Sequence, residues 1–143
     1  MYLFNRSITV NVRSEDEKIL KVEGVFLDSQ HELSLSLDVD LESYIITAAD
    51  GELRRAPHLD CSQTGELIKN LVGVNLNHNV RKQVQLAVGL SYGCTHLTDL
   101  TLECVKGLLQ AKFRLLRLKM KEEEIKGLFG KYLEGNCLHY KKS

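Results

Sequence analysis

The chain has 143 residues, with 19 basic and 19 acidic side chains, so its net charge at pH 7 is zero. That length is enough for one domain with a substantial core, and balanced charge disfavours a general nucleic-acid binder, which usually carries a basic excess. No run approaches the roughly 18 apolar residues of a membrane span, and the N-terminus lacks the pattern of a signal peptide. We therefore expect a cytoplasmic protein without a membrane partner, whose four cysteines are reduced thiols.

The N-terminal part of the chain shows the two-residue alternation of β-strands. Apolar residues occupy every second position most clearly in the third predicted strand, from Leu33 to Val39. The fourth strand is predicted to end at the turn pair Asp50-Gly51. Short connections between consecutive strands favour an antiparallel meander. The four strands are predicted at residues 8–12, 18–28, 33–39 and 44–48.

Beyond Pro57, the only proline, the spacing of apolar residues becomes helical. Asp60, with Gln63 three residues later, resembles a capping box at the start of the first helix. The longest helix begins near Cys94 and has a continuous apolar stripe that includes Cys104, which we interpret as a core residue. Helices are predicted over residues 60–73, over 79–88, from about 94 onward, and over 119–133.

These elements predict an α+β fold, in which an antiparallel meander of three to four strands is followed by three to four helices packed on one face. The sequence contains no internal repeat and no linker. We therefore expect a single domain over residues 1–143, with mainly strands at 1–53, mainly helices at 58–135 and a tail at 136–143.

Five cysteine and histidine residues stand where chemistry could occur. Cys94 and His96 lie at the start of the longest helix, and Cys61 follows a predicted N-cap. Unpaired backbone N–H groups and the helix dipole stabilise a thiolate at such positions, and a thiolate is both the nucleophilic and the metal-binding form. By strand parity His31 faces the core side, whereas Cys137 lies in the tail. Each residue also has a structural interpretation, a buried cysteine as a small apolar group and a strand-end histidine as a hydrogen-bonded one.

The run Gly93-Cys94-Thr95-His96-Leu97-Thr98-Asp99-Leu100 resembles the signature of a bacterial family of unknown function, number 2889. The resemblance extends over most of the chain and includes the Leu27-Asp28 strand end and the His31-Glu32-Leu33 step. The chain departs from the family pattern in a compact loop before His31 and in a short tail. The family has no assigned activity. Carried over residue by residue, the resemblance implies importance for the candidates His31, Cys61, Cys94, His96 and Cys137.

A more distant resemblance is to the iron–sulfur scaffold and sulfur-acceptor superfamily. There a three-stranded meander leads into a helix that opens with a cysteine, here Cys61, and a later helix opens with a histidine–cysteine pair, here Cys94-Thr95-His96. In this chain the histidine follows the cysteine instead of preceding it. The resemblance implies a shared fold and an iron–sulfur or sulfur-handling function.

Three functions remain open from the sequence. The first is a metal or iron–sulfur site in which Cys61, Cys94 and His96 converge with His31 or Cys137, and zinc or an iron–sulfur cluster suits such ligands. The second is a cysteine-dependent enzyme or sulfur acceptor with Cys94 as nucleophile. The third is an interaction module whose last amphipathic helix docks a partner or a second copy. Whether the protein is an enzyme is left undecided.

Overall fold

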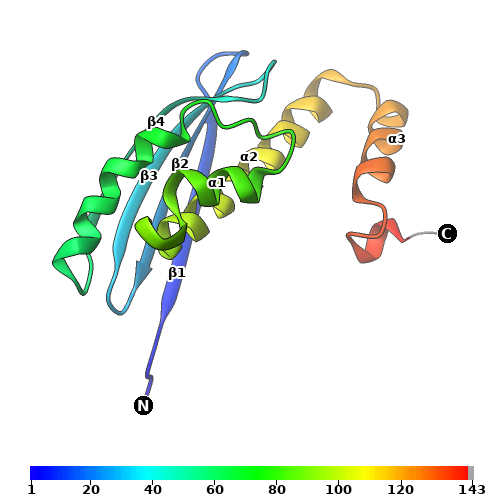
Figure 1. Ribbon diagram of the computed structural model, residues 1–143. Helices are drawn as coiled ribbons and strands as arrows, with labels where there is room; N and C mark the ends of the chain where they lie inside the picture. Colours follow the sequence, from blue (N-terminus) through cyan, green and yellow to red (C-terminus); the bar gives the residue numbers. More distant parts are fainter. Residues whose placement is uncertain (142–143) are drawn as a thin grey trace. The chain divides into compact units, whose positions relative to one another are not determined.

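The computed structural model describes residues 1–141 and begins with a four-stranded antiparallel sheet in the order β1-β2-β3-β4 (Figure 1). Each strand pairs with the next along the chain, so the sheet is the predicted meander and the fold is α+β. The strands are β1 (Arg6–Ser14), β2 (Ile19–Asp28), β3 (Glu32–Asp40) and β4 (Ile46–Arg55).

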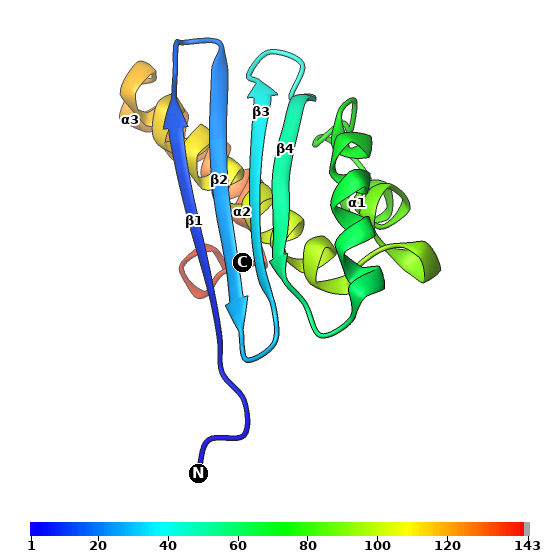
Figure 2. The same cartoon turned by 90° about the vertical axis from the view of Figure 1, so that its left-hand side faces the viewer.

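The helical part of the chain follows the sheet. Its elements are η1 (Leu59–Leu71), α1 (Val80–Val88), η2 (Leu90–Tyr92), α2 (Thr95–Lys119), α3 (Glu122–Leu133) and η3 (Leu138–Tyr140), where η marks a 3₁₀ helix. Figure 2 shows α2 crossing one face of the sheet, with η1 and α1 beside the β4 edge. The buried side chains of β2 and β3 face this helical layer, because alternate residues of a strand point to one side.

Two local predictions are wrong. The pair Asp50-Gly51 is not a turn, because β4 continues to Arg55 and Gly51 pairs with Leu35 of β3. A Cβ atom on Gly51 would clash with the Ser34 carbonyl oxygen, so the glycine serves a close approach between strands instead of a turn. The predicted capping box at Asp60 is also absent, since His58 is the N-cap residue of η1 and its side chain makes no capping bond.

Glycine in β2 brings α2 close to the middle of the sheet. A Cβ atom on Gly24 would lie 2.5 Å from the Cys104 sulfur and 2.9 Å from a Leu100 methyl carbon. One turn further along α2, a Cβ atom on Gly107 would lie 2.7 Å from the Val10 side chain of β1. The helix therefore packs directly on the strands, and Cys104 and Leu100 are fully buried between the two layers. This close packing sets where the first turn of α2 meets the end of β2.

The chain divides into two compact units, Met1–Leu109 and Gln110–Ser143. The first holds the sheet, η1, α1, η2 and most of α2, and the second holds the end of α2, α3 and η3. The expectation of one domain over residues 1–143 stays a prediction. Within residues 1–141, no helix combines the length and apolar character needed to cross a membrane.

Candidate metal centre

The run Gly93–Leu100 forms the entry to α2. The carbonyl groups of Val88 and Gly89 occupy the space that a Cβ atom on Gly93 would need, so only glycine fits there without a shift. The next backbone N–H, of Cys94, donates to the Val88 carbonyl oxygen at 2.8 Å. The Cys94 carbonyl oxygen in turn accepts bonds from the Thr98 N–H at 3.0 Å and the Thr98 hydroxyl at 3.1 Å. These bonds fix the direction in which the first turn of α2 presents its side chains.

The turn between β2 and β3 is organised by the carboxylate of Asp28. Its Oδ1 accepts hydrogen bonds from the backbone N–H of Gln30 at 2.9 Å and of His31 at 2.7 Å. The same oxygen lies 3.0 Å from Nδ1 of the His31 ring. The Arg55 guanidinium donates to the Asp28 carbonyl oxygen at 2.8 Å and to the Ser29 carbonyl oxygen at 3.0 Å. Asp28 and His31 are both buried, as strand parity predicts for His31.

His96, on the first turn of α2, reaches this buried turn. Its Nε2 lies 4.0 Å from Oδ2 of Asp28, and its ring stacks on the ring of His31 with centroids 3.8 Å apart and an interplanar angle of 29°. The Phe26 ring packs against the His96 ring in a T-shaped arrangement with a centroid distance of 5.4 Å. One ligand atom from each of Asp28, His31 and His96 can be chosen so that all three lie within 4.8 Å of one another. No other group of three His, Cys, Asp or Glu residues comes as close within residues 1–141.

The protonation states of this cluster suit metal binding. Burial by itself raises the pKa of Asp28, but the N–H of Gln30 and the ring and N–H of His31 outweigh it and hold that pKa well below its usual value. For His96, burial first and then the neighbouring His31 lower the pKa, against the opposing charge of Asp28. At neutral pH the carboxylate is therefore charged and the His96 imidazole is neutral, which are the forms that bind metal ions.

Cys94 lies beside the cluster without belonging to it. Its Sγ is 3.8 Å from Nδ1 of His96, and the thiol is largely buried. A metal-binding histidine usually hydrogen-bonds through its second ring nitrogen, which fixes the tautomer and the ring orientation. With Nδ1 of His96 directed at Cys94, Nε2 is the nitrogen that faces Asp28.

The predicted site residues are thus only partly brought together. His31 and His96 share one cluster and Cys94 contacts it, whereas Cys61 is not a member and lines a separate hollow of about 520 Å³ with Tyr92 and Gly93. Cys137 is exposed and belongs to the second unit. Cys104 is fully buried, and this burial raises the pKa of its thiol to about 12.

Asp28 is the functional candidate that the sequence analysis missed. In the sequence it stands out only as the end of a strand. The signal that could have identified it is an acidic residue three positions before His31 in a strand-to-strand turn, since an aspartate at the start of such a turn bonds to backbone groups two and three residues later.

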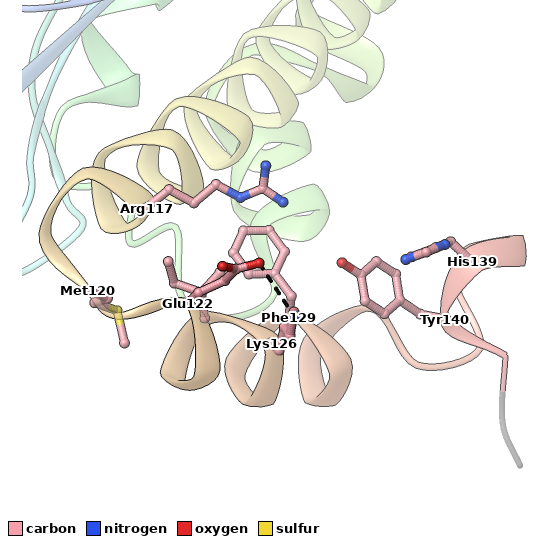
Figure 3. Close-up of a pocket in the computed structure, with 8 residues that line it drawn as sticks. Arg117, Met120, Glu122, Lys126, Phe129, His139 and Tyr140 are labelled. Atoms are coloured by element: carbon pink, nitrogen blue, oxygen red, sulfur yellow. Dashed lines mark ion pairs between the residues drawn. The ribbon is translucent and has the colours of Figure 1, made fainter.

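The second unit has a pocket of its own, of about 570 Å³ (Figure 3). Arg117 lies over the ring of Phe129, with the guanidinium carbon 4.8 Å from the ring centroid. Lys126 pairs with Glu122 at 3.5 Å, and the Tyr140 ring closes one side. None of the cluster residues lines this pocket.

Comparison with known proteins identifies a family. Residues 4–110 match the model of a family described as a protein of unknown function (DUF2889). The matched region includes the whole Asp28–His31–His96 cluster and ends one residue beyond the first compact unit. No curated protein and no solved structure matches the chain.

Proposed function

This chain belongs to the DUF2889 family, and from the geometry of its site we propose that it binds one divalent transition-metal ion through Asp28, His31 and His96. The observation that carries the proposal is that one carboxylate and two imidazoles, two of these three groups buried, have ligand atoms within 4.8 Å of one another. Two histidines and one carboxylate are a ligand set used for zinc and for non-haem iron(II).

The ligand chemistry favours a single ion such as zinc over an iron–sulfur cluster. Iron–sulfur clusters are held mainly by cysteine thiolates, and the only cysteine at this cluster is Cys94, which contacts the far nitrogen of His96. Three protein ligands also leave at least one coordination position for water or for a small molecule, as in zinc sites that carry out reactions.

Metal binding requires a change in the histidine stack. An imidazole nitrogen directs its lone pair within the plane of the ring, and the planes of His31 and His96 are only 29° from parallel. Both rings can therefore point at one ion only after one of them turns. His96 is the ring with room to turn, because its side chain is 23% exposed whereas that of His31 is 11% exposed. We expect the stack to open when the ion binds, which NMR of the imidazole protons would detect.

The test is a Zn²⁺ titration by calorimetry of protein purified without an affinity tag and stripped with a chelator, with metal analysis of the complex. We expect one ion per chain. The substitution His96→Gln should weaken Zn²⁺ binding about 100-fold or more, and Cys94→Ser about 10-fold, since changes beside a ligand typically cost 10–100-fold.

His78→Gln is the matched control, because His78 is exposed and outside the cluster. It should bind Zn²⁺ as the wild type does. The proposal is wrong if the wild type takes up neither Zn²⁺, Co²⁺ nor Fe²⁺, or if His96→Gln and His78→Gln bind Zn²⁺ equally well.

Thiol chemistry at Cys94 is a second candidate, favoured by the 3.8 Å contact between Sγ and the His96 ring. It predicts that iodoacetamide modifies Cys94 in the folded protein faster than the exposed Cys137, and that His96→Gln removes the difference. A slower reaction at Cys94 would contradict it. The interaction-module alternative stays a prediction.

A further inference from the structure

The first unit has a polar cleft of about 290 Å³, and one residue of its lining, Arg6, forms an ion pair with Asp28 of the cluster. Its charged residues come from three elements: Arg6 from β1, Arg81 from α1, and Asp99, Glu103 and Lys106 from α2. Three of these residues therefore come from α2, the helix whose first turn carries His96.

Arg6 is shared by the cleft and the cluster. Its guanidinium nitrogen lies 3.5 Å from Oδ2 of Asp28, and its guanidinium carbon lies over the Phe26 ring, 4.7 Å from the centroid. The Phe26 ring also packs against His96. Arg6 therefore connects the cleft to the proposed metal site.

The charges of the cleft are unevenly compensated. Lys106 and Glu103 neutralise each other at 2.6 Å, whereas neither Arg81 nor Asp99 forms an ion pair among the described residues. With Arg6, the lining has three basic and two acidic side chains. A divalent ion bound by the Asp28 carboxylate would compete with Arg6 for that carboxylate. The side chains that line the cleft would then carry one net positive charge beside a positive ion. A guanidinium stays charged at all relevant pH values and binds carboxylates and phosphates through two parallel hydrogen bonds.

We propose that this cleft binds the carboxylate or phosphate group of a small anionic molecule through Arg6 and Arg81, while another polar group of that molecule occupies the open position of the metal ion. The inference rests on the proposed metal site and gives it a substrate class. A cleft of about 290 Å³ is near the lower end of ligand pockets, which suits a compact molecule better than a polymer.

The test titrates glycolate and, separately, inorganic phosphate into the Co²⁺-loaded protein, with calorimetry for affinity and visible absorption for contact with the ion. Tighter binding of one probe identifies the anionic group. Arg81→Gln should weaken the preferred anion about tenfold, the effect of losing a charged hydrogen-bond partner, and should leave Co²⁺ affinity unchanged. Lys82→Gln, which makes the same charge change one residue away outside the cleft, is the control and should behave as the wild type.

The outcomes separate the two proposals. Failure of the wild type to bind Co²⁺ or any other divalent ion would overturn the metal site itself. Normal Co²⁺ binding together with no binding of either anion, or with equal anion affinity in Arg81→Gln and the wild type, would overturn the anion cleft alone.

Discussion

Replacing Asp28 with asparagine tests the physical basis of the cluster. The substitution keeps the size of the side chain but removes the charge from an oxygen that accepts three hydrogen bonds. Hydrogen bonds to charged groups contribute about 1.5–3 kcal/mol and neutral ones about 0.5–1.5 kcal/mol, so each loses about 1 kcal/mol. The half-exposed ion pair with Arg6 adds at most about 1 kcal/mol. We expect the metal-free Asp28→Asn protein to be about 2–4 kcal/mol less stable at pH 7.

The stability that Asp28 contributes depends on pH, because its pKa differs between the folded and the unfolded chain. The pKa of Asp28 in the folded protein lies below the ordinary 3.8, so between these two values the unfolded chain binds more protons than the folded one. Stability from this group is therefore complete above about pH 4 and decreases as the pH falls through 3.8 towards the lower folded pKa. Asparagine binds no proton, so the difference between wild type and variant should narrow below pH 4.

Urea unfolding at pH 7 and pH 3, in the presence of a chelator, measures both effects. Asp50→Asn is the control, because Asp50 is exposed and the change should stay within about 0.5 kcal/mol. A variant of Asp28 as stable as the control at pH 7, or a deficit of equal size at both pH values, would refute the reasoning.

Two further predictions concern the packing of α2 on the sheet. Gly24→Ala should destabilise the protein by about 1–3 kcal/mol in urea unfolding, since its Cβ would lie 2.5 Å from the Cys104 sulfur. Adding Cys104→Ala should relieve part of that cost. If the two substitutions change the free energy of unfolding in a strictly additive way, the contact is contradicted. Iodoacetamide at pH 7.5 should leave Cys104 unmodified in the folded protein while it modifies the exposed Cys137, because burial raises the Cys104 pKa to about 12; equal modification of both by mass spectrometry would show that Cys104 is accessible.

Local sequence patterns predicted the elements well and their ends less well. The alternation from Leu33 to Val39 and the apolar stripe of α2 each reflect burial of one face, which acts on the local periodicity of the chain. The turn predicted at Gly51 was wrong because the sequence alone does not distinguish a glycine that permits close strand packing from one that permits a turn. Only the neighbouring strand distinguishes them.

The candidate site, too, was predictable from the sequence only in its local features. The sequence by itself placed His96 and Cys94 at a helix start and His31 on the core side of a strand end, because capping and strand parity are local properties. It could not say which of these groups meet. His31 and His96 come together only because Gly24 lets α2 pack closely on β2, which brings the helix start onto the Asp28 turn. Cys61 was also predicted at a helix start, but it lines a different hollow. Tertiary packing, which joins residues far apart in the chain, decided that the partner of the two histidines is the carboxylate of Asp28.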